Sequence, residues 1–199
     1  MNFDNFELFG FLMTNLHSFK TKSCLYILFS LILLIITQSY ADIPVSEVRF
    51  GVMRNDIHGN HLKYRHEKGY NFSGEILFPE FTGGIWEYLF NPKLHMGGAV
   101  NVGGYTSHVY TGLTWFIRMG PFVIEPTFGF DANNAEHHKK YKKRQCLGSN
   151  IMFRESISFG YKISKCWTGY LMIDHVSHAH IFHPNPGLST IGIRFGYAF

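Results

Sequence analysis

The most regular pattern in the sequence lies at its C-terminal end, where apolar residues alternate with small or polar ones. One face of this segment carries Ile191, Ile193, Phe195, Tyr197 and Phe199. The other face carries Thr190, Gly192, Arg194, Gly196 and Ala198. A period of two residues is typical of a β-strand with one apolar face. The pattern predicts a terminal strand over 189–199.

Similar short stretches, rich in Val, Ile, Phe, Tyr and Gly, recur between turn signals from Val45 onward, and none has the spacing of an amphipathic helix. The strands that we predict cover residues 45–53, 70–78, 93–103, 107–118, 121–130, 147–160, 165–177 and 189–199. Eight is an even number, as closure of a bacterial barrel requires. We therefore predict an all-β fold, an eight-stranded antiparallel up-and-down transmembrane β-barrel over 45–199.

Composition helps to separate this barrel from a soluble β-sandwich, which the strand pattern alone would also fit. Charged residues make up 16% of the chain, against roughly 25% in soluble globular proteins. The chain also contains 20 glycines and 20 phenylalanines. Apolar side chains facing lipid and a narrow interior filled by small or polar side chains account for this bias.

The N-terminal segment has the features of a signal peptide. Lys20 and Lys22 precede an apolar run over 24–37, which is followed by Ser-Tyr-Ala ending at Ala41. We predict a signal peptide over 1–41 with cleavage after Ala41, and Met13 as a possible true start. A membrane-spanning helix is the alternative, but about 14 apolar residues fall short of the ~20 needed to span a bilayer. The mature protein is therefore expected in the cell outer membrane of a Gram-negative bacterium.

The predicted topology concentrates positive charge in the exposed loops. If both ends of the barrel lie in the periplasm, the connections 54–69, 131–146 and 178–188 face outward. The second contains the candidate phosphate contacts Lys139, Lys140, Lys142, Lys143 and Arg144. Lys and Arg bind phosphates well, so contact with surface phosphates is one interpretation and a solvated loop is the other. No nucleic-acid partner is expected from this topology.

The two cysteines of the mature chain are predicted to lie at opposite ends of the barrel. Cys146 precedes one predicted strand and Cys166 lies near the start of the next. A strand rises about 3.3 Å per residue, and a disulfide requires Cα atoms within about 7 Å. We predict no disulfide between them.

The strand over 165–177 carries the residues best suited to chemistry. His175 and Ser177 are two residues apart and so share one face, together with Leu171 and Ile173, which marks this face as the outward one. An imidazole beside a hydroxyl can accept its proton and activate a serine nucleophile. A polar strand end without catalytic function is the alternative.

Several segments together resemble the lipid A 3-O-deacylase family, also called acyloxyacyl hydrolases. The resemblance is most specific over 174–179 (DHVSHA), 185–188 (NPGL) and 191–199 (IGIRFGYAF). Upstream stretches that resemble the family are 112–115, 120–122, 147–156 and 160–161. The resemblance implies an outer-membrane barrel that removes the ester-linked 3-hydroxyacyl chain of lipid A, with Ser177 as the nucleophile and His175 as the general base. Lipid A, or lipopolysaccharide, and outer-membrane lipid are the implied partners, and no cofactor is implied.

The sequence departs from the family pattern at two positions. His178 stands where the family commonly has an asparagine that could help an oxyanion site. His178 and Asn185 are the candidate substrate-binding or oxyanion residues in this sequence. Ser189 stands where the family has an acidic residue that orients the histidine. A serine can hydrogen-bond imidazole but cannot stabilise imidazolium as a carboxylate does.

No other carboxylate is expected to replace the missing one. Asp174 is predicted to point to the face opposite His175. Glu155 shares the outward face of its own strand, but a simple hairpin through 161–165 would place it opposite Leu171, roughly 13 Å from His175. We therefore expect Glu155 to be a poor third member unless a bulge shifts the register.

Four further interpretations concern a metal site, a barrel without catalytic function, a pore and a homodimer. The histidines over 175–183 do not form a persuasive ligand set, so no metal site is predicted. A catalytically silent structural or surface-interaction barrel is the main alternative to an enzyme, because of Ser189 and His178. A small pore is disfavoured because side chains fill the interior of an eight-stranded barrel. A homodimer is possible, and neither acyl-chain preference nor oligomeric state follows from the sequence.

Overall fold

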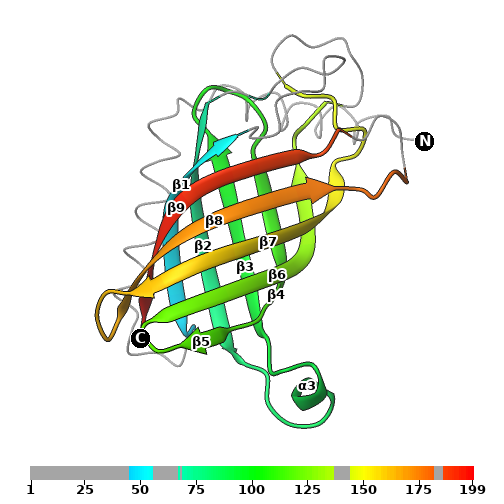
Figure 1. The fold of residues 1–199 in the computed structure, drawn as a ribbon. Helices are drawn as coiled ribbons and strands as arrows, with labels where there is room; N and C mark the ends of the chain where they lie inside the picture. Colours follow the sequence, from blue (N-terminus) through cyan, green and yellow to red (C-terminus); the bar gives the residue numbers. More distant parts are fainter. Residues whose placement is uncertain (1–44, 56–66, 68, 137–143, 182–185) are drawn as a thin grey trace, which may run out of the picture. The chain divides into compact units, whose positions relative to one another are not determined.

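The computed structural model describes residues 45–55, 67, 69–136, 144–181 and 186–199 (Figure 1). The strands in this part of the chain are β1 (Glu47–Asn55), β2 (Tyr70–Glu80), β3 (Lys93–Asn101), β4 (His108–Thr114), β5 (Ile117–Met119), β6 (Phe122–Asn133), β7 (Ile151–Lys162), β8 (Trp167–Ser177) and β9 (Leu188–Ala198). The described residues contain one helix, the single turn α3 (Ile85–Tyr88) between β2 and β3. None of their helices is long and apolar enough to cross a membrane. The predicted signal peptide over 1–41 lies outside the described residues.

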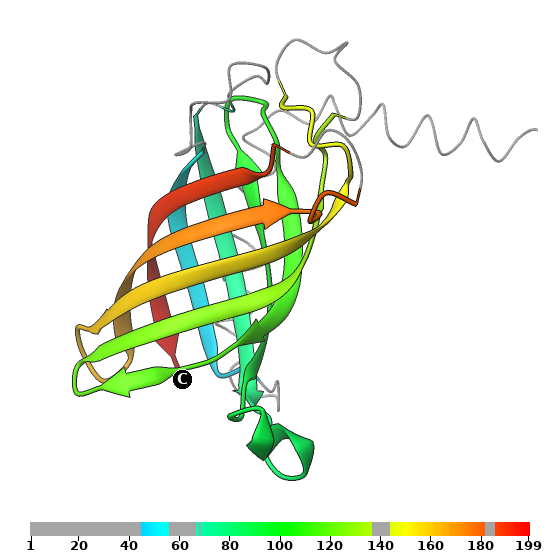
Figure 2. The same cartoon turned by 45° about the vertical axis from the view of Figure 1, so that its right-hand side comes forward.

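All strands belong to one antiparallel sheet that closes on itself. The order is β4-β3-β2-β1-β9-β8-β7-β6-β5, and pairing of β4 with β6 completes the closure. Because β4 and β5 both pair with β6, they are two segments of one barrel strand. The barrel therefore has eight strands, tilted as Figure 2 shows, and the predicted fold class is confirmed.

The prediction of one continuous strand over 107–118 was wrong at residues 115–116, where the strand is interrupted. Phe116 packs there against three cations, with Lys93 Nζ and Arg118 Cζ each 5.1 Å and Arg49 Cζ 5.9 Å from its ring centroid. Trp115 donates its indole N–H to the carbonyl of Leu89, 2.7 Å away. These contacts turn the two aromatic residues out of the regular alternation.

The two faces of the barrel wall differ as the alternating pattern over 189–199 predicts. Ile193 and Phe195 are exposed on the outside, whereas Arg194 between them is buried. The Arg194 guanidinium donates to Glu75 Oε1 and to Ser158 Oγ, each at 3.0 Å. Buried charges are costly unless they are paired and hydrogen-bonded. The interior therefore holds paired charges, and the apolar side chains face outward.

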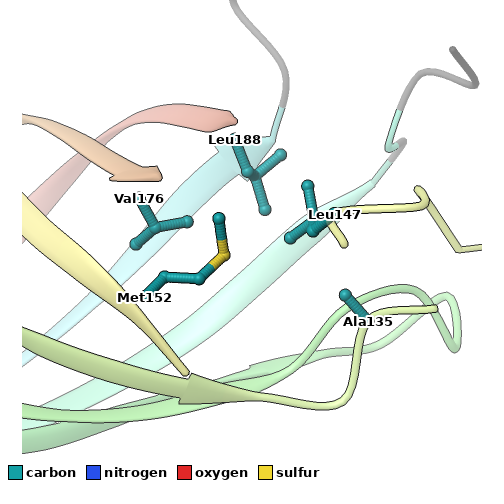
Figure 3. Packing of buried hydrophobic residues seen from close by; sticks show 5 residues of the cluster. All are labelled: Ala135, Leu147, Met152, Val176 and Leu188. Carbon is teal, nitrogen blue, oxygen red and sulfur yellow. The ribbon is translucent and has the colours of Figure 1, made fainter. Parts of the chain in front are cut away.

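A hydrophobic cluster lies inside one end of the barrel. We call the end at which β8 ends and β9 begins the β8–β9 rim. The cluster inside it consists of Ala135, Leu147, Met152, Val176 and Leu188 (Figure 3). Leu147 precedes β7 and is fully buried, so the cluster joins the β6–β7 connection to the ends of β8 and β9 from within.

The remaining connections place the two cysteines at opposite ends. Cys146 adjoins Leu147 at the β8–β9 rim, whereas Cys166 lies in the β7–β8 turn, at the end where the C-terminus lies (Figure 1). The two cysteines are not joined by a disulfide, which confirms the prediction.

Candidate active site

The candidate site is on the outer surface of the barrel, at the end of β8. His175 and Ser177 are both half-buried, and Val176 between them is buried in the hydrophobic cluster. Alternation along the strand therefore points His175 and Ser177 outward together. The cluster stabilises the strand from inside, and the two polar side chains remain on the outer face.

The imidazole of His175 is oriented by the residue that stands at the position of the family's acid. Ser189 is the direct partner of His175 in the β8–β9 ladder. His175 Nδ1 and Ser189 Oγ are 2.7 Å apart, a hydrogen bond. In the tautomer in which Nδ1 donates to Ser189, Nε2 carries the lone pair needed by a general base.

A glycine on the other side of the ring completes this arrangement. Gly187 adopts φ +63°, and a Cβ there would lie 2.8 Å from Cε1 and 3.1 Å from Nε2 of His175. Continuing the β8–β9 register by one residue places Gly187 opposite Ser177. Gly187 was not among the predicted site residues, although a glycine two residues before Ser189 was the available signal of close packing.

The register between β7 and β8 differs from the predicted one. Lys162 pairs with Thr168, so the turn covers 163–166 and Glu155 is the direct partner of His175 rather than of Leu171. The expectation that Glu155 lies far from His175 was therefore wrong. In the turn, Ser164 Oγ accepts hydrogen bonds from the backbone N–H groups of Cys166 (3.3 Å) and Trp167 (3.1 Å). These bonds stabilise a turn that strand alternation alone does not reveal.

An aromatic surface lies beside Ser177. Phe153 is the β7 partner of Ser177. Its ring centroid is 5.7 Å from that of Phe130 and 6.2 Å from that of Phe128, both on β6. The candidate pair of His175 and Ser177 is thus bordered by an apolar surface of the kind that an acyl chain can contact.

Two polar residues next to the pair point into the barrel instead. Asp174 is buried and forms a salt bridge with Arg154, with 2.8 Å between Arg154 Nε and Asp174 Oδ1. This confirms that Asp174 faces away from His175. His178 is also buried, and its Nε2 is 3.0 Å from the carbonyl oxygen of Leu147. Its role at an oxyanion site stays a prediction.

The other candidate residues lie partly outside the described chain. Asn185, Lys139, Lys140, Lys142 and Lys143 are not among the described residues. Arg144 is described, and its Nη1 donates to the carbonyl of Asn134 at 2.9 Å. Within the described ranges, no three His, Cys, Asp or Glu side chains form a group that could hold a metal ion.

The sequence matches the model of a protein family described as lipid A 3-O-deacylase (PagL) over residues 58–198. It has no significant match among curated protein sequences.

Solved structures show the same fold. The crystal structure of the outer membrane enzyme PagL superposes with a TM-score of 0.56 at 15% identity, covering 77% of this chain and 100% of that one. The N-terminal β-barrel domain of Pseudomonas aeruginosa OprF gives 0.52 at 10% identity, with coverage of 78% and 98%. Because the family model covers most of the barrel, this outer-membrane protein belongs to the lipid A 3-O-deacylase (PagL) family.

Proposed function

We propose that the protein is a serine esterase that removes the ester-linked 3-hydroxyacyl chain from position 3 of lipid A. The observation that carries the proposal is the outward pair His175 and Ser177, with the imidazole held at Nδ1 by Ser189, 2.7 Å away. A site on the outer wall of a barrel faces lipid, so its substrate can be a membrane lipid. Family membership supports lipid A as that lipid.

The chemistry follows from the roles of two side chains. His175 Nε2 takes the proton of Ser177 Oγ as the oxygen attacks the ester carbonyl, giving a tetrahedral intermediate. Collapse of the intermediate breaks the bond to the sugar oxygen, which receives the proton from His175. Water, deprotonated by His175, then attacks the acyl-enzyme, releasing a free 3-hydroxy fatty acid and regenerating Ser177.

The surroundings of the pair suit this substrate. The Phe128, Phe130 and Phe153 surface borders Ser177 and can contact the hydrocarbon chain of the substrate. Arg144, at the same end of the barrel, and the lysines of the same connection are proposed to contact the phosphates of lipid A. The predicted orientation, with the β8–β9 rim outward, would place Ser177 in the outer leaflet.

The test is hydrolysis of lipid A by the folded, purified barrel, followed by mass spectrometry of the products. We expect loss of one 3-hydroxyacyl chain, abolished by Ser177→Ala. Ser149→Ala is a matched control, because Ser149 is near the same end and its Oγ donates only to a nearby backbone carbonyl, that of Ile151. Activity that survives Ser177→Ala would exclude the proposed nucleophile.

A barrel without hydrolytic activity is the second candidate, and Ser189 is the observation that favours it. A hydroxyl on Nδ1 orients the imidazole but carries no negative charge. The variant Ser189→Glu separates the two candidates. A gain in hydrolysis in Ser189→Glu supports a site capable of catalysis. If the unaltered protein and Ser189→Glu are both inactive, the result supports the silent barrel.

A further inference from the structure

The outward wall formed by β6 to β9 contains one unusual pair of residues. Its described positions are apolar, small or uncharged except for Glu155 on β7 and His175 on β8. Glu155 follows Phe153 and precedes Ile157 on the same face, and its β6 partner is Phe128. An ionisable side chain on a lipid-facing surface is unfavourable and commonly marks a functional site. The carboxylate and the imidazole are direct cross-strand partners.

We propose that Glu155 is a positioning residue that supplies the negative charge missing from position 189. The proposal rests on the proposed function, in which His175 is the general base. During attack by Ser177 the imidazole becomes positively charged, and a neighbouring carboxylate stabilises that charge. Ser189 fixes the orientation of the ring from β9, and Glu155 provides the charge from β7. The two tasks that one acid performs in a Ser-His-acid triad are thus divided between two strands.

The geometry of the ladder supports this division. Direct partners in an antiparallel pair have Cβ atoms about 4.5–5.5 Å apart and point to the same face. Glu155 is exposed on that face, so its carboxylate is not committed to the barrel interior. The site is on the outward face of a membrane barrel, where contact with lipid lowers the dielectric constant and strengthens interactions between charges. A cross-strand carboxylate therefore interacts strongly with the imidazolium that forms in the reaction.

Other charged groups near His175 do not fill this role. Those on the elements around it are Arg154, Asp174, His178, His180 and Arg54. Arg154 and Asp174 form an ion pair inside the barrel. His178 is buried against the Leu147 carbonyl, and His180 lies in the turn that follows β8. Arg54 is on β1, beyond β9, opposite Ile191, and its positive charge would oppose imidazolium formation.

The central variant is Glu155→Gln, which keeps the size of the side chain and removes its charge. We expect kcat/KM for lipid A to fall on the order of 10- to 100-fold. This is less than the roughly 10⁴-fold loss when a serine hydrolase loses its orienting acid, because Ser189 still holds the ring. Glu136→Gln, in the β6–β7 connection at the same end, is the matched control.

Moving the carboxylate from position 155 to position 189 gives a result that a merely structural role of Glu155 would not produce. The double variant Glu155→Gln/Ser189→Glu should recover at least about tenfold of the lost activity, because one carboxylate again lies beside the ring. The single variant Ser189→Glu should gain less, because Glu155 already supplies the charge. Heat-modifiable electrophoretic mobility checks that each barrel is folded.

The outcomes separate this inference from the proposed function. If Ser177→Ala is inactive while Glu155→Gln retains full activity, the role of Glu155 is overturned and the esterase stands. Equal gains from Ser189→Glu with and without Glu155 would also overturn it. If the folded, unaltered protein does not hydrolyse lipid A, both proposals fail.

Discussion

Gly187 offers the sharpest structural test of the way in which His175 is held. A Cβ at this position would lie 2.8 Å from His175 Cε1 and 3.1 Å from Nε2. Carbon atoms in contact are normally about 3.5–4.0 Å apart, so the ring of a Gly187→Ala variant must move by about 0.7 Å or more. Such a movement disturbs the 2.7 Å hydrogen bond between Nδ1 and Ser189 Oγ.

The expected effect is on catalysis more than on stability. A displacement of about 1 Å in a catalytic group can lower a rate about 10²-fold, and we expect a loss of this order in kcat for Gly187→Ala. The left-handed backbone at φ +63° adds a cost of roughly 1–2 kcal/mol for any residue with a Cβ. This strain has to be separated from the displacement of the ring.

Gly104→Ala provides that separation. Gly104 also has a positive φ, +76°, but a Cβ there would meet no atom within 4 Å. The two variants should lose similar stability in thermal unfolding, whereas only Gly187→Ala should lose lipid A hydrolysis, measured by mass spectrometry. If Gly187→Ala is as active as Gly104→Ala, the close packing of Gly187 on His175 has no part in catalysis.

Three further variants test the site and the barrel that supports it. Ser189→Ala should lower kcat about tenfold, the effect of losing one hydrogen bond worth about 1.5 kcal/mol, with little change in thermal unfolding. Leu147→Ala should lower the free energy of unfolding in urea by about 2–5 kcal/mol, because Leu147 is fully buried in the rim cluster. Arg194→Ala should cost about 3–5 kcal/mol in the same assay, because it removes a buried partner of Glu75. An unchanged urea midpoint for either barrel variant, or full activity of Ser189→Ala, would contradict these assignments.

Strand alternation allowed the barrel and the outward side of the site to be predicted. The period of two over 189–199 identified the lipid-facing side of β9, and the same parity placed His175 and Ser177 on that side. It also placed Asp174 inside. These predictions concern which face a side chain occupies, and the face depends only on the odd or even position along a strand.

The position of Glu155 could not be obtained in this way. The predicted and observed registers of β7 and β8 differ by four residues, from Leu171 to His175 as the partner of Glu155. A shift by an even number leaves every side chain on the same face, so both registers fit the hydrophobic pattern equally well. The choice depends on the turn at 163–166, where Ser164 accepts two backbone hydrogen bonds.

Partners across the barrel were also beyond sequence reasoning. The inward position of Arg194 followed from parity, but its contacts with Glu75 and Ser158 join residues 119 and 36 positions away. The interruption of the strand at Trp115 and Phe116 likewise depends on contacts with distant residues. The partners of Arg194 and the interruption of the strand both depend on which distant residues the closed sheet brings together.

The central claim, that Ser177 is the nucleophile of a lipid A 3-O-deacylase, is tested most directly by locating the covalent intermediate. The folded barrel would be mixed with lipid A, quenched with acid within the first turnover, digested and analysed by peptide mass spectrometry. We expect a 3-hydroxyacyl ester on the peptide that contains Ser177, and no such ester in Ser177→Ala. An ester on another residue, or release of the 3-hydroxy fatty acid by Ser177→Ala, would contradict the account.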